Sequence, residues 1–223
     1  MTRILMIGLL TTVVTSAQNL QLHYDLRREH MTSTFEMFKP DRRGATFWFI
    51  DLDYNDTQGC RNASLAYFEI ARYWSLPGIK NTAVTLQYND GLTNAFSFNP
   101  IWLAGFQYGF TIGPLFLPFD LLARKELDTK GLTFQLTTSW FKPLGRFEMT
   151  GFLDLWSTGR DAFPSRRWVL LSEPQLWFRI TDHIKVGGEL EISYNFSGAY
   201  TKTDLFETGR LFLLPTIGAK WHF

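Results

Sequence analysis

Carboxylate side chains recur at alternate positions in several stretches of this 223-residue chain. Asp51 and Asp53 alternate with apolar residues between positions 47 and 54, and Glu189 and Glu191 do the same between 184 and 194. Because successive side chains of a β-strand point to opposite faces, the acids of each stretch share one face. Such a face attracts cations and accepts hydrogen bonds, so it is the first candidate for chemistry.

Aromatic residues and a few bases share this polar face. The acids expected there are Asp25, Glu36, Asp51, Asp53, Glu69, Asp120, Glu148, Asp154, Glu173, Glu189 and Glu191. The bases expected there are Arg27, Arg124, Arg179, Lys185 and Lys220. The interleaved aromatic residues are Phe47, Phe49, Tyr67, Trp156 and Trp177. Acids outnumber bases, so the face is negative overall, and the rings offer flat surfaces on which a solute ring could stack.

Two interpretations of these acids remain open. Any single acid can pair with an arginine or lysine and tie strands together, since buried charges must be paired. As a group, however, the acids exceed the available bases, and unpaired acids are costly unless water or a solute reaches them. The candidate solute-binding set is Asp25, Glu36, Phe49, Asp51, Asp53, Tyr67, Glu69, Arg124, Glu148, Asp154, Trp156, Glu173, Trp177, Glu189 and Glu191.

Extended strands must position these residues. Alternation predicts twelve of them, over about 20–27, 32–38, 45–54, 63–74, 82–90, 100–110, 117–125, 132–141, 146–156, 168–180, 184–196 and 211–223. Pro174 falls in the middle of the tenth strand and lacks a backbone N–H, so a bulge or a break is expected there. The last strand alternates apolar residues with Lys220 and His222 and ends on Phe223, an ending typical of outer-membrane barrels.

The N-terminus has the pattern of an export signal. Arg3 precedes an apolar run from Ile4 to Val14, and small residues end at Ala17, so residues 1–17 are expected to be a signal peptide and 18–223 the folded domain. Mean hydropathy is −0.09, and the body has no run of about 18 apolar residues, so a membrane-spanning form must be a β one.

Tryptophan positions favour a barrel in a membrane. An even strand number returns both termini to the periplasmic side, with short turns there and the longer segments 157–167 and 197–209 outside. Trp48, Trp74, Trp140 and Trp221 then face outward near periplasmic strand ends, and Trp102 and Trp168 near extracellular ends. A soluble lipocalin-like barrel would invert the faces and would have no reason to place Trp at both rims. The expected fold is therefore an all-β, antiparallel, up-and-down transmembrane barrel.

Composition argues against several other functions. Removal of Arg3 with the signal leaves 21 Lys and Arg against 21 Asp and Glu, so the basic surface of a nucleic-acid binder is absent. Cys60 is the single cysteine and cannot form an internal disulfide. The four histidines lack zinc-site spacing and no G-x-S-x-G motif occurs, so we expect neither a metal, a cofactor nor an enzyme. His23 beside Asp25 is the one seed of a hydrolase; the alternative is a lumen His satisfied by a neighbouring acid.

Several segments resemble a family of outer-membrane barrel proteins of unknown function from Bacteroidetes, which is distantly similar to the nucleoside-specific Tsx-like channels. They are LHYDL at 22–26, EMFKPD at 36–41, SLAYFEIAR at 64–72, SEPQLWF at 172–178, VGGELEISYNF at 186–196 and the final KWHF. The resemblance implies a monomeric twelve-stranded barrel whose narrow lumen binds nucleosides weakly during diffusion.

The expected function is passive uptake of small neutral or cationic polar solutes, such as nucleosides, through a narrow acidic and aromatic lumen. The alternative is a non-transporting structural or adhesion barrel, or a small lipid-modifying enzyme of the outer membrane. The expected partners are outer-membrane lipids, the solute, and the outer-membrane assembly machinery through Phe223, with no nucleic acid.

Overall fold

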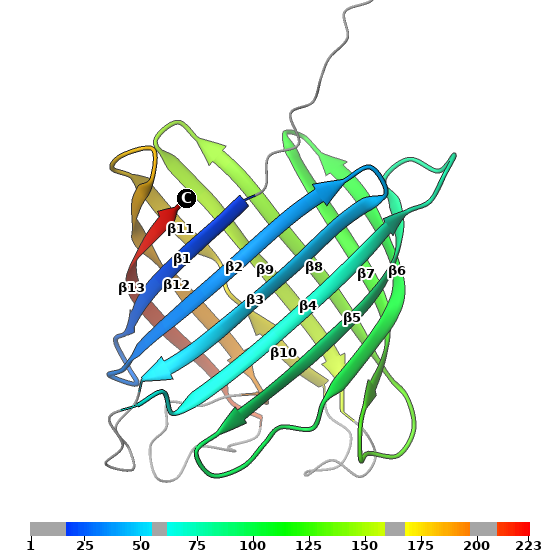
Figure 1. The fold of residues 1–223 in the computed structure, drawn as a ribbon, viewed down its shortest axis with the longest axis horizontal. Coiled ribbons are helices and arrows are strands. Elements are labelled where there is room, and N and C mark those ends of the chain that lie inside the picture. The colour runs from blue at the N-terminus through cyan, green and yellow to red at the C-terminus, as the bar shows by residue number, and fades with distance from the viewer. Residues whose placement is uncertain (1–16, 55–61, 159–167, 197–208) are drawn as a thin grey trace, which may run out of the picture.

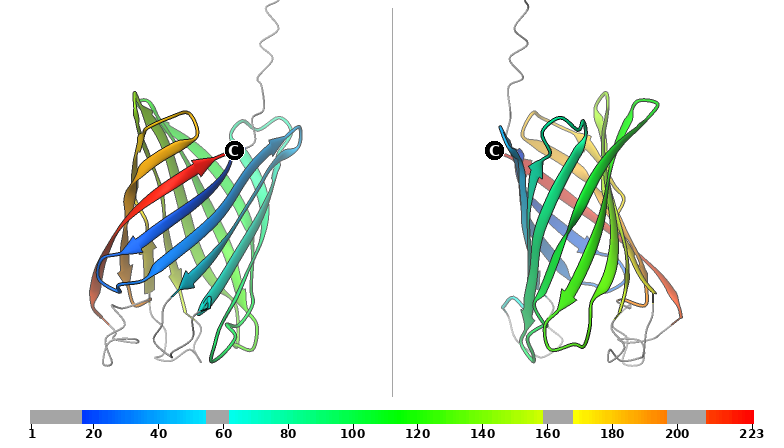
Figure 2. Two further views of the ribbon diagram at one scale, coloured as in Figure 1. Left: turned by 60° about the vertical axis from the view of Figure 1, so that its left-hand side comes forward. Right: turned by 90° about the vertical axis from the view of Figure 1, so that its right-hand side faces the viewer.

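The computed structural model describes residues 17–54, 62–158, 168–196 and 209–223, and these residues form one β-sheet closed on itself (Figures 1 and 2). The strands are β1 (Ala17–Asp25), β2 (Met31–Asp41), β3 (Gly44–Tyr54), β4 (Leu65–Ser75), β5 (Thr82–Thr93), β6 (Ile101–Ile112), β7 (Leu115–Glu126), β8 (Thr133–Leu144), β9 (Phe147–Ser157), β10 (Trp168–Ser172), β11 (Gln175–Arg179), β12 (Ile184–Tyr194) and β13 (Leu211–His222). Within this part of the chain no helix is long and apolar enough to cross a membrane.

The sheet closes through its first and last strands. β1 pairs antiparallel with β13 from Asn19 opposite His222 to Asp25 opposite Thr216. β10 and β11 both pair with β9 on one side and β12 on the other, so they are two halves of one strand. The described residues therefore form a closed twelve-stranded antiparallel barrel, and the predicted fold class is confirmed. Closure leaves no unpaired sheet edge.

Pro174 separates the two halves of that strand, at the position where a break was predicted. Its carbonyl accepts a bond from the Leu190 N–H at 3.0 Å, but the proline has no N–H to return. On the other side lies Gly151 of β9, where an added Cβ would lie 2.6 Å from the Glu173 carbonyl oxygen. The register does not slip, since Leu171 pairs with Asp154 and Gln175 with Thr150.

A second proline lies in the same row of the wall. Leu190 of β12 stands opposite Pro215 of β13. The Pro215 carbonyl accepts a bond from the Leu26 N–H at 3.0 Å, and again nothing is donated in return. A single bond therefore replaces the pair of a regular ladder at two places, between Pro174 and β12 and between β13 and the end of β1.

The two faces of the barrel differ sharply. Large apolar side chains on the outside are exposed, among them Phe106 and Phe134 at 61%. Polar side chains on the inside are buried, including Gln21 at 1% and Lys220 at 3%. A soluble barrel would show the reverse, so the apolar outer face is suited to lipid.

The two ends of the barrel also differ. Both termini and the short connections 42–43, 113–114 and 145–146 lie at one end, uppermost in Figure 1. At the other end β3, β9 and β12 lead into 55–61, 159–167 and 197–208, which lie outside the described residues. Most of the expected signal peptide, Cys60 and most of the two long predicted loops also fall outside them. By the rule for bacterial barrels, the end with the short turns is periplasmic.

Candidate functional site

The cross-strand register places the whole predicted site on the lumen face. Asp51 pairs with Tyr67, Phe49 with Glu69, and Gln175 with Glu189, and paired residues point to the same side of a sheet. Following the pairs around the barrel brings these candidates to this side as well: Asp25, Glu36, Asp53, Arg124, Glu148, Asp154, Trp156, Trp177 and Glu191. Glu173 lies between β10 and β11, in alternation with Leu171 and Gln175, which are on the lumen face. They do not form one cluster but separate into three groups with different surroundings.

The first group, which we call the acid belt, lies around the middle of the lumen. Its members come from both walls, and their charges act on one another: Asp51 with Glu69 and Glu189, and Asp154 with Glu69 and Asp120. β4 and β9 stand five strands apart in a barrel of twelve, so carboxylates from nearly opposite walls approach each other. The acid belt comprises Asp51, Glu69, Asp120, Asp154, Glu173 and Glu189.

Neutral donors hold the belt acids. Asp51 accepts a hydrogen bond from the Thr34 hydroxyl at 2.5 Å, and Glu189 accepts one from the Gln175 amide at 2.7 Å. Asp120 accepts hydrogen bonds from Tyr73, Gln87 and Gln107 between 2.8 and 3.1 Å. Among the described residues no lysine or arginine nitrogen lies within 4.0 Å of a belt carboxylate. In this part of the chain the belt carboxylates are therefore held by neutral hydrogen-bond donors and not by basic side chains.

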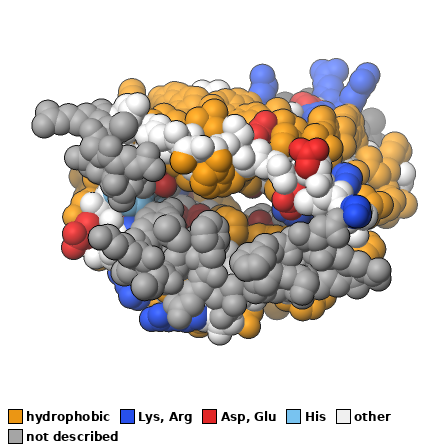
Figure 3. Space-filling view, turned by 90° about the horizontal axis from the view of Figure 1, so that it is seen from below, with side chains coloured by type: hydrophobic (Ala, Val, Ile, Leu, Met, Phe, Trp, Pro, Cys, Tyr) orange, Lys and Arg blue, Asp and Glu red, His pale blue; other side chains and the backbone are white. Residues whose placement is uncertain are grey.

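Solvent reaches most of the belt. Asp51, Glu69, Asp154, Glu173 and Glu189 are half-buried, although each points inward from the wall. Seen from the extracellular end, acidic side chains show inside the hollow between the barrel walls (Figure 3). Because the carboxylates face this hollow, a passing solute would meet them directly.

The second group, the lysine layer, lies toward the periplasmic end and is internally paired. Lys185 and Lys220 are cross-strand partners, and Glu148 lies 2.5 Å from the Lys185 Nζ and 3.9 Å from the Lys220 Nζ. Lys220 also lies 4.5 Å from the ring centre of Trp177, which is fully buried. These charges tie β9, β12 and β13 together, which agrees with the structural interpretation of Glu148.

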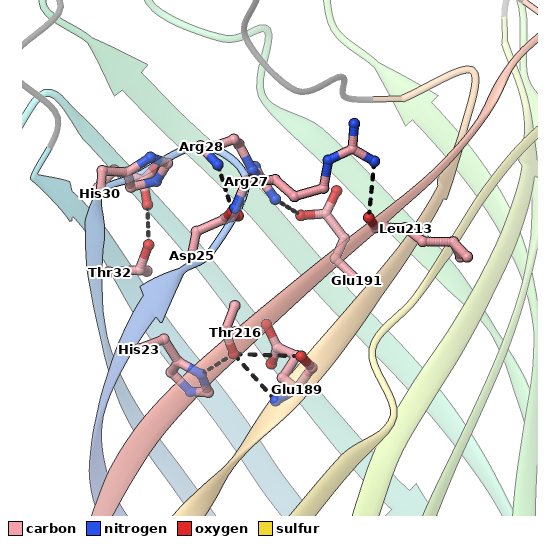
Figure 4. A network of polar contacts seen from close by, with 11 residues as sticks. His23, Asp25, Arg27, Arg28, His30, Thr32, Glu189, Glu191, Leu213 and Thr216 are labelled. Atoms are coloured by element: carbon pink, nitrogen blue, oxygen red, sulfur yellow. Dashed lines mark hydrogen bonds and ion pairs between the residues drawn. The ribbon is translucent and has the colours of Figure 1, made fainter.

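The third group lies at the extracellular end and contains a correction. Arg27 was predicted to point into the lumen, but it is exposed and its guanidinium bonds to the Leu213 carbonyl. Arg28 instead pairs with Asp25 at 2.7 Å and with Glu191 (Figure 4). The Asp25 carboxylate also accepts hydrogen bonds from the backbone N–H groups of Arg27 and Arg28, both at 2.7 Å. These bonds form a turn that ends β1, so strand alternation no longer applies after Asp25.

Two histidines lie on or near the lumen face, and His23 differs from expectation. His23 does not bond to Asp25; its ring contacts the Thr216 hydroxyl at 2.9 Å and the Gln21 amide oxygen at 3.1 Å. The hydrolase seed therefore lacks its His–acid contact. His30 lies in the connection between β1 and β2, where it is buried and 3.6 Å from Asp53, which also accepts a bond from Thr32 at 2.6 Å. Among the described residues no three His, Cys, Asp or Glu side chains are grouped to hold a metal ion.

Aromatic rings run along the wall beside the belt. Phe47, Phe49 and Tyr67 follow one another with ring centres 5.9 and 6.1 Å apart. Phe98, which lies beyond the predicted strand and was missed, continues the series 6.3 Å from Tyr67. Trp156 lies on β9, with Arg124 5.9 Å from its ring centre. In the sequence Phe98 lies in the polar segment from Asn89 to Asn99, which has no strand alternation that would place its side chain in the lumen.

A closed barrel with an apolar outer face and a charged interior defines a β-barrel of the bacterial outer membrane. The chain matches the family model described as "Domain of unknown function (DUF5020)" over residues 17–223, so it belongs to that family. The comparison with curated proteins finds no match.

Solved porins share the fold. A NanC porin is 8% identical with a TM-score of 0.60, and the match covers 92% of this chain and 99% of the porin. A KdgM porin is 8% identical with a TM-score of 0.54, covering 94% and 99%, and a KdgM porin in complex with disordered oligogalacturonate gives 0.53 over the same shares at 8% identity. At this identity the likeness concerns the fold alone.

Proposed function

We propose that the protein is a passive outer-membrane channel for small neutral or cationic polar solutes, with nucleoside-like molecules as the preferred class. The observation that carries the proposal is the acid belt, whose carboxylates face the hollow of the lumen without a basic partner among the described residues. A negative constriction repels anions and admits cations or neutral donors. The aromatic rings beside it suit a solute with a flat ring.

The porin fold supports transport in general, but the lumen chemistry argues for a different solute from one neighbour's. A KdgM porin has been seen with oligogalacturonate, whose repeated carboxylates make it a polyanion. Six acids in the belt would repel such a chain. Nucleosides carry no such charge, and they combine a flat base with hydroxyl donors.

Planar bilayer recording of the purified protein tests the proposal. We expect steady conductance, a reversal potential in a KCl gradient that shows cation preference, and reduced current when adenosine or uridine is added. The double variant Asp51→Asn with Glu69→Gln removes two belt charges and should lower the cation preference. The matched control is Asp41→Asn, because Asp41 is exposed at the periplasmic turn. A barrel that never conducts, or a double variant with unchanged cation preference, contradicts the proposal.

The competing class is a barrel that does not transport. The paired lysine layer and the extracellular ion pairs would serve a plugged structural barrel equally well. The acid belt would not, since unpaired carboxylates inside a closed plug carry a desolvation cost with no compensation. The channel is therefore the function that the geometry supports best.

A further inference from the structure

A row of five aromatic rings extends from the extracellular mouth past the acid belt. The ring centres of Phe96 and Phe98 are 5.6 Å apart, and the series continues through Tyr67 and Phe49 to Phe47 in steps of 6.3, 6.1 and 5.9 Å. Each step lies within the range of about 4.5 to 7 Å that is usual for packed aromatic pairs, so the rings form a continuous aromatic strip along the wall. Phe96 is 54% exposed, so the row begins where a solute would arrive.

The backbone after β5 holds Phe98 in this row. The Phe98 N–H bonds to the Gly91 carbonyl at 2.8 Å, and the Thr93 N–H bonds to the Phe96 carbonyl at 2.7 Å, so the segment folds back on the strand. Gly91 pairs with Tyr67 on the lumen face. A Cβ added at Gly91 would lie 2.6 Å from the Phe98 ring and 2.9 Å from the Tyr67 ring, so the missing side chain makes room for both rings.

At one corner of the acid belt, beside Tyr67, the hydrogen bonds of Glu69 and Asn89 leave an acceptor atom without a donor. Asn89 donates its amide N–H groups to Glu69 Oε1 at 2.8 Å and to the Tyr67 hydroxyl at 3.2 Å. The Tyr67 hydroxyl donates to the same Glu69 oxygen at 2.6 Å. These bonds fix the amide orientation, since a flipped Asn89 would direct its oxygen at a carboxylate.

The same bonds leave the Asn89 Oδ1 without a donor. Asn89 is 7% exposed, and among the described residues no group donates to this oxygen. A buried acceptor without a partner is costly, so this corner keeps Asn89 in place at a cost in order to direct both of its N–H donors to Glu69 and Tyr67. Glu69 adds a negative charge at the same corner.

We infer that the Glu69 and Asn89 corner, with the aromatic row as its approach, is a binding subsite for planar rings that carry N–H donors on their edge, such as aryl amidines and amino-substituted heterocycles. The ring stacks on the row, while its donors reach the half-buried Glu69 carboxylate, which Asn89 and Tyr67 hold in place. The inference rests on the proposed channel, because the row leads a solute toward the constriction.

Three small cations separate the parts of this subsite. Benzamidine has a flat ring and an amidinium edge; cyclohexanecarboxamidine keeps the edge and loses the flat ring; trimethylanilinium keeps the flat ring and the charge but has no N–H donor. Calorimetric titration of the detergent-solubilised full-length barrel should show benzamidine binding about tenfold more tightly than either, since stacking and donor contacts each contribute on that scale. Equal affinities for the three cations overturn the inference.

Variants locate the subsite on the row. Phe98→Leu should weaken benzamidine binding several-fold and leave cyclohexanecarboxamidine unaffected, whereas Phe106→Leu, at an outward position exposed by 61%, should change neither. If Phe98→Leu fails to fold, the comparison of the three cations on the unmodified protein still decides.

The titration also separates this inference from the proposed function. A barrel that binds benzamidine selectively but does not conduct overturns the channel and keeps the subsite. A cation-selective channel that binds the three probes alike keeps the channel and overturns the subsite.

Discussion

Glu148 and Asp154 both point into the lumen from β9, yet their surroundings are opposite. Glu148 lies against two lysines of the lysine layer, at 2.5 and 3.9 Å. Asp154 has the Thr137 hydroxyl at 2.5 Å and feels the charges of Glu69 and Asp120. Two carboxylates of one strand therefore have different surroundings: Glu148 holds strands together through lysines, while Asp154 has a neutral donor and, in the proposed channel, contributes to the cation preference.

The largest expected effect comes from breaking the lysine layer. Glu148→Gln leaves two buried lysines as neighbours without their shared counter-charge, which should lower the free energy of unfolding by about 3 kcal/mol. Urea unfolding in lipid vesicles, followed by tryptophan fluorescence, measures it. Lys185→Gln added to Glu148→Gln should restore part of the loss, and a single variant as stable as the parent would contradict the structural role.

The companion change in the acid belt should act in the other direction. Asp154→Asn keeps the size of the side chain and removes a charge that Glu69 and Asp120 repel. Stability should stay the same or rise, by up to about 1 kcal/mol, while cation preference in the bilayer falls. A destabilised Asp154→Asn barrel would show that the two acids do not differ in role.

Increasing the salt concentration should affect the acid belt more than the lysine layer, with smaller effects than the substitutions have. Raising KCl from 0.1 to 1 M shortens the screening length from about 10 to about 3 Å, so the cation preference of the half-buried belt should decrease by about half or more. The close contacts of the lysine layer are screened less, and stability should change little. Reversal potentials and unfolding curves over the same salt series check this, and a preference that is constant with salt argues against an electrostatic origin.

The smallest effect is expected outside both groups. Arg72 and Asp41 form a 2.6 Å ion pair at the periplasmic end, but 24% and 42% of their side chains are exposed. Exposed pairs contribute little, so Arg72→Gln should leave stability and selectivity unchanged within measurement error. A clear loss of either would extend the lysine layer's structural role to this rim.

Sequence alternation predicts which face a residue occupies, but not which neighbours it meets. It was enough for twelve strands, the break at Pro174 and the inward side of Asp51 and Glu189, because each depends on local periodicity. It could not separate Glu148 from Asp154, since their partners come from β12, β13 and β8, and the register between strands is set by the whole closed sheet.

Errors concentrate where strands end. Arg27 was placed inside in error because Asp25 caps two backbone N–H groups and turns the chain, which passes the inward role to Arg28. Phe98 was missed because it reaches the lumen by a fold-back onto Gly91 rather than by alternation. Both are loop conformations that no period-2 pattern describes.

Pro174 and Pro215, which lie in one row with Leu190, leave two sides of the barrel wall with different numbers of cross-strand hydrogen bonds. Each proline removes one donor from the hydrogen-bonded girth of the barrel at the height of Glu173, Glu189 and Glu191. The opposing acids, Asp51 and Glu69, stand on β3 and β4, whose pairing runs without interruption. One side of the barrel wall therefore has fewer cross-strand bonds than the other, and we expect it to be the side that deforms first when the barrel is strained.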